Sequence, residues 1–427
     1  MDRIVRQTIS EGIRFTSIRD ARFKQSLLSV NFLLPLQRET AAVNALLPMV
    51  LRRGCEDYPD MTALNSRLKE LYGARLDGGV IKRGEAQIVS FYCEMLDNRY
   101  ALEGEDMLTE CASLLQSVIF RPVLKNGVFD ENEVAIERHN LSDLIDAQLN
   151  DKRAYASRRL KEEMCRDEAF GISELGSREE AAAVTPQVLT DAWKRMLASA
   201  QVEIFLISEG EGEGCERLFT QTFRALSRTQ TAVCETQVIR HAGKVKTVEE
   251  HLPVSQAKLV MGFRAGIATP DADVPAMQLA CNILGGSPNS KLFANVREAL
   301  SLCYYCFSRF ERQKGLILIE SGIESANYQK AREAILAQLA DVQAGDFTDD
   351  EMKAAVMSLQ NSYMEISDSL AELSAWYLGQ AVAGTMHAPS EAAQEVAALS
   401  REEVVAAARK IEPDTFYLLA GEKGEEV

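Results

Sequence analysis

The stretch TPQVLTDAWKRMLASAQVEIFLI, residues 185–207, predicts a helix that is followed directly by a strand. Thr185 can cap this helix, and Pro186 can take its first position, where a proline costs no hydrogen bond. The same order of elements recurs near the C-terminus, where Ser400 opens a capping box and a helix and a strand-like run follow, up to Leu419. Ser400 follows Thr185 by 215 residues, so this unit of the fold is expected to occur twice.

Other segments match in the same order along the two halves. An acidic entry to a long charged helix occurs at 129–133 and again at 347–351, and a strand with a helix behind it occurs at 27–32 and again at 258–263. The helices behind these strands end near glycines, Gly54 and Gly285, as helices often do. The first long helix is expected to break near Asn150. Matches in one order at offsets of 215 to 231 residues favour a duplicated domain.

Each half of the chain reads as strand, helix, helix, strands, helix, long helix, helix and strand. Because strands and helices do not alternate strictly, this pattern predicts an α+β fold with two homologous domains, each a mostly antiparallel sheet with helices on one face. The turn-rich stretch between the halves is the natural linker. We expect an N-terminal domain at 1–227, a linker at 228–246 and a C-terminal domain at 247–427.

The composition restricts the classes of function. The 427 residues include 47 Lys and Arg against 63 Asp and Glu, which gives a net charge of −16 and a sequence pI of about 5.0. Nucleic acids and anionic membranes attract positive surfaces, so neither is the expected partner. The nine cysteines are an odd number spread along the chain, and the N-terminus lacks the apolar core of a signal peptide. We therefore expect a cytoplasmic protein with reduced thiols.

The residues that carry chemistry do not form a recognisable active site. Of the four histidines, no two stand three to five residues apart, so no helix face presents the pair that many metal sites use. Neither a phosphate-binding glycine loop nor a GxSxG nucleophile elbow is present. Cys303 and Cys306 form a single CxxC, whose alternation with Tyr305 and Phe307 indicates a strand with thiols in the interior. These residues predict a protein without its own active site.

A longer pattern begins at a glycine pair in the second half. The segment GGSPNSKLFANVRE at 285–298, followed by Leu302-Cys303-Tyr304, resembles the C-terminal signature of the pitrilysin/insulinase family of zinc peptidases. In that family the signature reads as glycine, serine, a Leu-Phe pair, Arg-Glu and a tyrosine seven residues after the arginine. The resemblance covers nearly the whole chain. It implies two homologous domains of a metallohydrolase-like duplicated fold, which form half of a closable peptide chamber.

The same resemblance implies an inverted zinc motif, HxxEH, on the helix behind the first strand, and a glutamate ligand on the later long helix. In such a motif two histidines share one helix face, and the glutamate can activate a metal-bound water. Aligned on Gly54, the motif positions fall on Ala45, Pro48 and Met49, and the helix ligand falls near Leu144. None of these side chains binds zinc tightly or transfers a proton, so we expect a degenerate site without zinc or another cofactor. Pro48 also predicts a kink or a late start of its helix.

Arg297 and Tyr304, in contrast, match the family signature. In the family this pair binds the substrate backbone, for which a guanidinium offers a rigid donor fork and a phenol one hydroxyl. A lost zinc site with a retained pair is typical of the non-catalytic subunit in two-chain members such as mitochondrial processing peptidase. The resemblance implies a chain that is not an enzyme on its own, that joins an HxxEH-bearing paralogous subunit and that helps to bind a peptide or protein substrate. Within the family it is similar to the inactive partner of paired Gram-positive proteins associated with aminopentanol modification of elongation factor P.

Two other interpretations stay open. One is a non-proteolytic scaffold homodimer of the same fold. The other is a stand-alone enzyme with a different chemistry at Cys303 and Cys306. Co-purification with an HxxEH-bearing paralogue would separate the peptidase subunit from the scaffold, and unreactive thiols in the native protein would exclude the cysteine enzyme.

Overall fold

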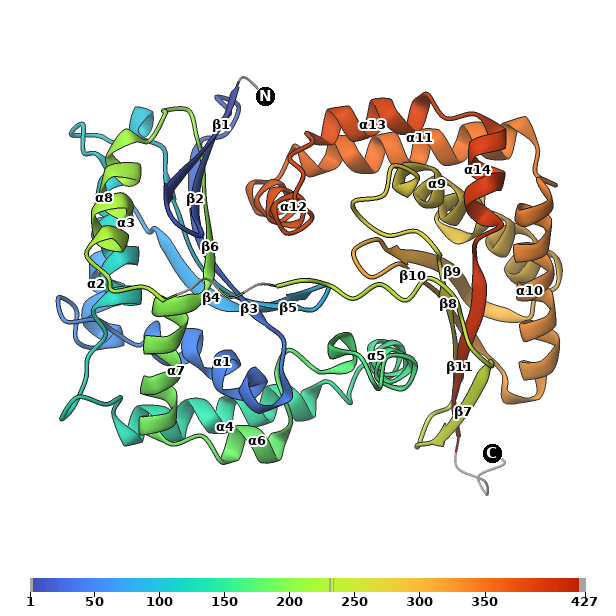
Figure 1. Ribbon diagram of the computed structural model, residues 1–427, viewed down its shortest axis with the longest axis horizontal. Helices are drawn as coiled ribbons and strands as arrows, with labels where there is room; N and C mark the ends of the chain where they lie inside the picture. The colour runs from blue at the N-terminus through green and yellow to red at the C-terminus, as the bar shows by residue number, and fades with distance from the viewer. Residues whose placement is uncertain (1–2, 230–231, 233, 422–427) are drawn as a thin grey trace. The chain divides into compact units, whose positions relative to one another are not determined.

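The computed structural model describes residues 3–229, 232 and 234–421, and Figure 1 shows its elements. The chain forms two compact units. Unit 1 comprises Met1–Asp146, Ile172–Glu235 and Leu370–Leu378, and unit 2 comprises Ala147–Gly171, Thr236–Ser369 and Gly379–Val427. Each unit therefore includes one segment from the other half of the sequence. The homologous-domain boundaries at 227 and 247 stay a prediction, and residues 230–231 and 233 of the expected linker lie outside the described residues.

A six-stranded mixed sheet forms the centre of unit 1. Across the sheet the strands follow the order β1 (Arg3–Ser10), β2 (Ile13–Arg19), β6 (Gln201–Ser208), β3 (Gln25–Pro35), β5 (Ala86–Leu96) and β4 (Arg75–Arg83). β2 and β6 pair in parallel, and the other neighbouring strands pair antiparallel. The sheet is thus mostly antiparallel, as expected.

Unit 2 contains a five-stranded sheet in the order β7 (Lys246–His251), β11 (Glu412–Ala420), β8 (Ala257–Arg264), β10 (Leu316–Ile323) and β9 (Cys303–Glu311). β7 pairs with β11 in parallel, and the remaining neighbours pair antiparallel. Strand for strand, this order matches β2–β6–β3–β5–β4 of unit 1, including the position of the parallel pair. The α+β prediction is confirmed, and the duplication appears as a repeated sheet topology.

The core of unit 1 lies between its sheet and its helices. Helices of this unit include α1 (Arg38–Leu51), α2 (Met61–Glu70), α3 (Met107–Phe120), α4 (Glu131–Ala147), α6 (Arg178–Ala182), α7 (Pro186–Ser199) and α8 (Glu213–Arg224). Alternate residues of β3, such as Val30 and Phe32, belong to this core, as the period of a strand requires. The predicted cap of α7 is confirmed, because Thr185 accepts a hydrogen bond from the Val188 amide at 3.3 Å.

The main core of unit 2 lies between its sheet and α9 (Val274–Gly285), α10 (Tyr328–Ala344), α11 (Asp349–Ile366), α13 (Pro389–Ala397) and α14 (Arg401–Ala408). The capping box predicted at Ser400 opens α14. A second apolar cluster joins α5 (Lys152–Met164) to this sheet, with Leu160 of α5 among Val260, Leu318 and Tyr417 of the strands. The sheet of unit 2 was expected to have helices on one face only. The structure has them on both faces, because α5 covers the second one. α12 (Leu370–Val382) starts with residues that belong to unit 1.

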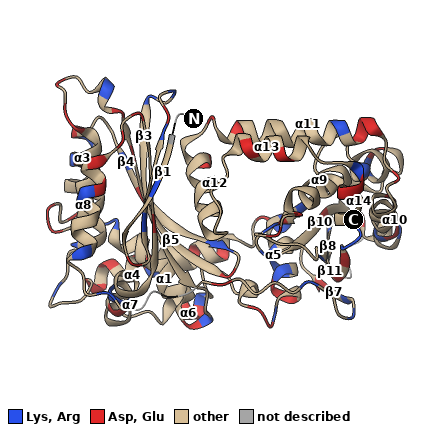
Figure 2. Cartoon of the chain, turned by 45° about the horizontal axis from the view of Figure 1, so that its top comes forward, with Lys and Arg blue, Asp and Glu red and all other residues tan. Residues whose placement is uncertain are grey.

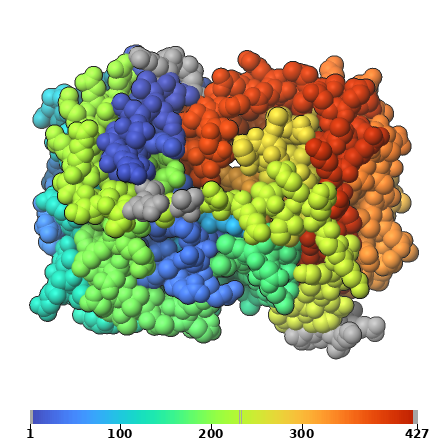
Figure 3. All heavy atoms as spheres, in the orientation of Figure 1, coloured from blue at the N-terminus to red at the C-terminus, as the bar shows by residue number. Residues whose placement is uncertain are grey.

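The surface carries charges of both signs, and Figure 2 shows basic and acidic positions together on α8. On this helix an Arg217 nitrogen lies 3.7 Å from a Glu213 carboxylate oxygen. The strands β1 and β2 reach the surface on the face that Figure 3 shows, and Val5 of β1 is 36% exposed. None of the helices in the described part of the chain is long and apolar enough to cross a membrane.

Candidate functional site

The positions aligned with the zinc motif lie on α1 and take part in core packing. Ala45 is 2% exposed, Pro48 is buried, and Met49 packs against the same apolar core. A methyl group, a pyrrolidine ring and a thioether are not among the thiolate, imidazole and carboxylate ligands that zinc takes from proteins. Among the residues that the structure describes, no group of three or more His, Cys, Asp or Glu side chains is placed to hold a metal ion. The residues present therefore do not fit the zinc that the family resemblance implies.

Pro48 lies inside α1 and not at its start. The helix begins at Arg38, so the expected late start is wrong, and the kink stays a prediction. The proline lies in the last turn of the helix. Helical hydrogen bonding continues past it, because the Arg52 amide donates to the Pro48 carbonyl oxygen at 3.3 Å. A Cβ added to Gly78 of β4 would come within 3.2 Å of Pro48 Cβ. Gly78 thus allows a helix with an internal proline to lie close to the sheet.

Glu137 of α4 is a buried carboxylate that pairs with Arg53, just beyond the end of α1, and the sequence did not indicate this role. Glu137 is 4% exposed, and its Oε1 accepts a hydrogen bond from Arg53 Nη1 at 2.7 Å. Its other oxygen accepts from Asn140 Nδ2 at 2.9 Å. Leu144 of the same helix is 48% exposed. The signal available in the sequence was the spacing of Glu133 and Glu137, which share a helix face and both pair with Arg53.

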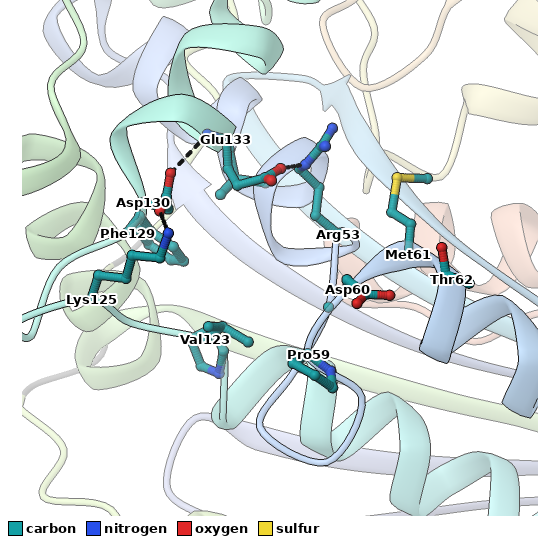
Figure 4. Close-up of a pocket in the computed structure, with 13 residues that line it drawn as sticks. Arg53, Pro59, Asp60, Met61, Thr62, Val123, Lys125, Phe129, Asp130 and Glu133 are labelled. Atoms are coloured by element: carbon teal, nitrogen blue, oxygen red, sulfur yellow. Dashed lines mark hydrogen bonds and ion pairs between the residues drawn. The ribbon is translucent and has the colours of Figure 1, made fainter.

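A cavity of about 300 Å³ is lined in part by Arg53 and Glu133, and Figure 4 shows its wall. The charged side chains of the wall are Arg53, Asp60, Lys125, Asp130 and Glu133. Arg53 pairs with Glu133, and Lys125 pairs with Asp130. Asp60 caps α2 by accepting a hydrogen bond from the Ala63 amide at 2.9 Å. Each of these five charged groups is therefore already engaged in an ion pair or in a helix cap.

Arg297 lies on η3 (Leu292–Ala299), an eight-residue π-helix in unit 2. Its side chain is 39% exposed, and its guanidinium carbon lies 4.5 Å from the centre of the Phe293 ring. The carboxylate of Glu298 is 3.6 Å from Arg297 Nε and is itself 59% exposed. The arginine is therefore held by a ring and a solvated carboxylate, and most of its donor fork can face an incoming peptide.

Tyr304 lies near the start of β9 and is 60% exposed. Its hydroxyl lies 3.5 Å from Glu324 Oε1, at the outer limit of a hydrogen bond. β9 is the last strand in the order of its sheet, so one of its edges has no neighbouring strand among the described residues. The phenol is thus accessible for hydrogen bonding, and the outer edge of β9 pairs with no other described strand.

The backbone is irregular at three points around Arg297 and Tyr304. The π-helix holds the arginine, Ser301 has a φ of +50°, and the register of β9 against β10 shifts beside Tyr304. π-Helices, bulges and left-handed non-glycine residues all cost stability or order, and they occur preferentially at functional sites. η3 also packs against β9. Arg297 and Tyr304 therefore lie on two elements that pack against each other, and the backbone of both elements is irregular.

The interior placement of the thiols is confirmed, because Cys303 is 8% and Cys306 is 4% exposed. The expected alternation, which placed Cys303 on the same side of the strand as Tyr305 and Phe307, is wrong. Both cysteines belong to the main core of unit 2, whereas Tyr305 and Phe307 stack on Arg153 of α5. The extra residue in β9 moves Cys303 to the side of Cys306.

The chain is similar to several known proteins. Residues 183–359 match the family described as Peptidase M16 inactive domain, a region that contains Arg297 and Tyr304 and lies outside α1. Over nearly its whole length the chain is similar to the probable inactive metalloprotease YmfF of Bacillus subtilis (strain 168). The identity is 29% over 413 residues, which cover 97% of this chain and 97% of that protein.

Solved structures repeat the fold over the full chain. A conserved protein from Enterococcus faecalis V583 has a TM-score of 0.88 and 27% identity, over 99% of this chain and 100% of that chain. A peptidase M16 inactive domain from Pseudomonas fluorescens has a TM-score of 0.77 and 17% identity, over 99% of this chain and 100% of that chain.

Proposed function

We propose that this chain, an M16 (pitrilysin-like) metalloprotease homologue of the inactive type, is the non-catalytic subunit of a two-chain zinc peptidase. It contributes half of a peptide chamber and supplies Arg297 and Tyr304. A paralogous subunit with an intact HxxEH motif supplies the zinc and the general base. One contrast supports this proposal: α1 has core-packing residues at all three motif positions, whereas Arg297 and Tyr304 are exposed on irregular backbone.

The chemistry around Arg297 and Tyr304 suits an extended peptide. A strand at the end of a sheet, as β9 is, can hydrogen-bond to the main chain of such a peptide, independently of the peptide's side chains. The Arg297 guanidinium donates to carbonyl oxygens in a fixed geometry, and the Tyr304 hydroxyl can donate or accept. In a partner's active site such donors stabilise negative charge that develops on a scissile carbonyl. The expected substrate is therefore a peptide or an unfolded protein segment.

The identity of the partner follows from the same proposal. Because the zinc ligands are missing here, the second subunit must contain them, and a paralogue encoded next to this chain is the first candidate. The similarity to the subunits associated with aminopentanol modification of elongation factor P belongs to this proposal as well. The name of the Bacillus subtilis relative, a probable inactive metalloprotease, agrees with a non-catalytic role.

Co-expression tests the proposal directly. This chain and the HxxEH-bearing paralogue are produced alone and together, and each preparation is incubated with quenched fluorescent peptides. We expect a stable complex that cleaves peptides faster than either subunit alone, with activity lost on chelation of zinc. A chain that forms only homodimers and leaves the paralogue's activity unchanged would overturn the proposal and favour the scaffold interpretation.

A further inference from the structure

A row of residues crosses three strands of unit 2 on the face that α5 covers. Lys258 of β8 pairs with Gly322 of β10, and Gly322 pairs with Tyr305 of β9, so these three positions face the same side of the sheet. Because Gly322 has no side chain, the Tyr305 ring lies close over it, and a Cβ added to Gly322 would come within 2.5 Å of Tyr305 Cε1. The ring therefore reaches across β10, and Lys258 Nζ lies 5.8 Å from its centre.

Arg153 of α5 stacks on the same ring. Its guanidinium carbon is 4.6 Å from the centre of the Tyr305 ring and 4.3 Å from the centre of the Phe307 ring. The centres of the two rings are 6.0 Å apart, so both rings support one guanidinium. Stacking covers a flat face of a guanidinium and leaves the N–H donors at its edge available. The Arg153 side chain is also 49% exposed, so a ligand can reach these donors.

The carboxylate beside Arg153 is shared among several donors. Glu320 Oε2 is 3.5 Å from Arg153 Nε, at the outer limit of a hydrogen bond. Glu320 also accepts from Ser157 at 2.9 Å and lies 3.8 Å from Arg309, and its side chain is only 6% exposed. Among the described residues, no acceptor is hydrogen-bonded to the terminal nitrogens of Arg153. Nη1 and Nη2 are therefore available to an incoming acceptor.

Lys258 is a second cation with spare donors. Its ammonium donates to Gln256, and no carboxylate oxygen of the described residues lies within 4.0 Å of it. Burial and repulsion by Arg153 lower the pKa of Lys258, although Asp151 acts in the opposite direction. Asp151 itself caps α5, where it accepts hydrogen bonds from the Arg153 and Ala154 amides at 3.0 Å. Two cations near one ring, without enough anions to neutralise both, attract a negative group.

We propose that Arg153 and Lys258 form a carboxylate-binding site, and that this site selects peptides with an acidic side chain or a free C-terminus. The edge of the guanidinium donates to the carboxylate oxygens, and the ammonium supplies a further donor. Tyr305 and Phe307 hold the guanidinium in place for this contact. Tyr305 directly follows Tyr304 in β9, so the site adjoins the peptide contact proposed above. As a determinant of substrate choice, the site rests on the proposed function.

Binding of three peptides to the full chain, without a partner subunit, tests the site. The peptides carry a neutral fluorophore and differ in charge alone: one has a central glutamate and an amidated C-terminus, one has glutamine and a free C-terminus, and one has glutamine and an amidated C-terminus. We expect fluorescence polarisation to give a Kd about tenfold lower for one or both carboxylate peptides than for the neutral peptide, since a charge-assisted hydrogen bond contributes a factor of this order. The more tightly bound peptide identifies the source of the carboxylate. Equal affinities, or no measurable binding of any peptide, would overturn the proposal.

Variants locate the binding. Arg153→Gln and Lys258→Gln should each bring the affinities for charged and neutral peptides close together. Arg158→Gln is the matched control, because Arg158 also lies on α5, stacks on Tyr155 at 5.3 Å and pairs with Glu162 at 3.5 Å. This control should keep the full preference for a carboxylate. A preference that survives in both site variants, or that the control loses as well, would contradict the assignment.

Melting temperatures show whether each variant is folded. Arg153→Gln also removes a partner of the buried Glu320, whereas Lys258→Gln leaves no described carboxylate without its ion pair, so Lys258→Gln should melt near the wild-type temperature. It therefore tests the site even where Arg153→Gln is destabilised. Because these measurements need no peptidase partner, a chain that binds carboxylates but forms no active complex would contradict the proposed function alone. An active complex without a carboxylate preference would contradict this inference alone.

Discussion

Glu168 Oε1 accepts a hydrogen bond from Arg264 Nη2 at 2.7 Å, and Glu168 Oε2 lies 2.7 Å from Lys314 Nζ. The side chains are buried, with exposures of 5% for Glu168, 4% for Arg264 and 0% for Lys314. Arg264 also pairs with Asp414 at 2.8 Å. Glu168 lies in the segment Ala147–Gly171, which comes from the first half of the sequence but belongs to unit 2. A buried ionic cluster therefore holds this segment in its unit.

Replacement of Glu168 by glutamine should strongly destabilise unit 2. The variant keeps two buried cations and removes a carboxylate that compensates them, and breaking a buried ion pair in this way costs about 3–5 kcal/mol. The free energy of unfolding, measured by urea denaturation with circular dichroism, should fall by an amount of this order. Glu162→Gln is the control, because Glu162 pairs with Arg159 on the same helix and is 28% exposed. Its loss should cost less than about 1 kcal/mol, and equal effects of the two changes would contradict this role of Glu168.

The same cluster predicts a loss of stability in acid. Burial alone raises the pKa of Glu168, but hydrogen bonds from Arg264 and Lys314 outweigh burial and lower the pKa below its usual value. A carboxylate whose pKa is lower in the folded state stabilises the fold above its unfolded pKa of about 4.3. This contribution disappears as the pH falls through the lower, folded value.

Thermal unfolding from pH 7 to pH 3 measures this contribution. The difference in midpoint between wild type and Glu168→Gln should be constant near neutral pH. It should shrink as the pH falls below the unfolded pKa of about 4.3, because the unfolded wild-type chain then binds a proton that folded Glu168 binds only at a lower pH. A difference that persists unchanged to the lowest pH would contradict the assignment.

Local signals predicted much of the fold. Thr185 and Ser400 cap helices through side-chain hydrogen bonds to nearby amides, so their motifs can be recognised in the sequence without knowledge of distant contacts. The break expected near Asn150 is confirmed, because α4 ends at Ala147 and α5 begins at Lys152. The signature at 285–304 likewise predicted a resemblance to pitrilysin/insulinase peptidases, and residues 183–359, which contain it, match the family described as Peptidase M16 inactive domain.

Long-range contacts decide the features that the sequence did not predict. α5 is a charged helix whose partners on the sheet of unit 2 lie far along the chain, such as Glu320, which accepts from Ser157 at 2.9 Å. No period in α5 indicates which sheet it joins. The bulge at Tyr304 depends on the pairing of β9 with β10, and the role of Glu137 depends on Arg53. Register and ion pairing between distant segments are properties of the folded chain.

The purified chain should contain no stoichiometric zinc. Ala45, Pro48 and Met49 lack donor groups of the kind that zinc binds, and Glu137 is already engaged by Arg53. Elemental analysis of protein purified without affinity tags that bind metals checks this expectation. Stoichiometric zinc that a chelator removes, with a fall in melting temperature, would show a site built from other residues. Arg53→Ala is an informative comparison, because it releases Glu137 but restores none of the missing ligands.

Arg297→Ala should separate activity from stability. The carboxylate that pairs with Arg297, that of Glu298, is 59% exposed, so its charge stays solvated when the arginine is removed. The free energy of unfolding should therefore change by no more than about 0.5 kcal/mol. Peptide cleavage by the two-chain complex should fall, because a positioned donor to the substrate is lost. Tyr304→Phe should act in the same direction but more weakly, since the ring remains and only the hydroxyl is removed.

Arg217→Ala provides the matched control for this pair, since Arg217 is a 71% exposed arginine of α8 that pairs with Glu213 on the same helix. It removes the same charge from a surface outside the proposed site, and cleavage should stay at the wild-type rate. Steady-state rates over a range of peptide concentrations, together with melting temperatures, distinguish the outcomes. A large fall in melting temperature for Arg297→Ala with normal cleavage would identify Arg297 as a structural residue. Arg297 lies on the π-helix that packs against β9, whereas Arg217 lies on α8. Equal losses of cleavage in Arg297→Ala and Arg217→Ala would therefore point to a general effect of the lost charge and contradict a specific role of Arg297.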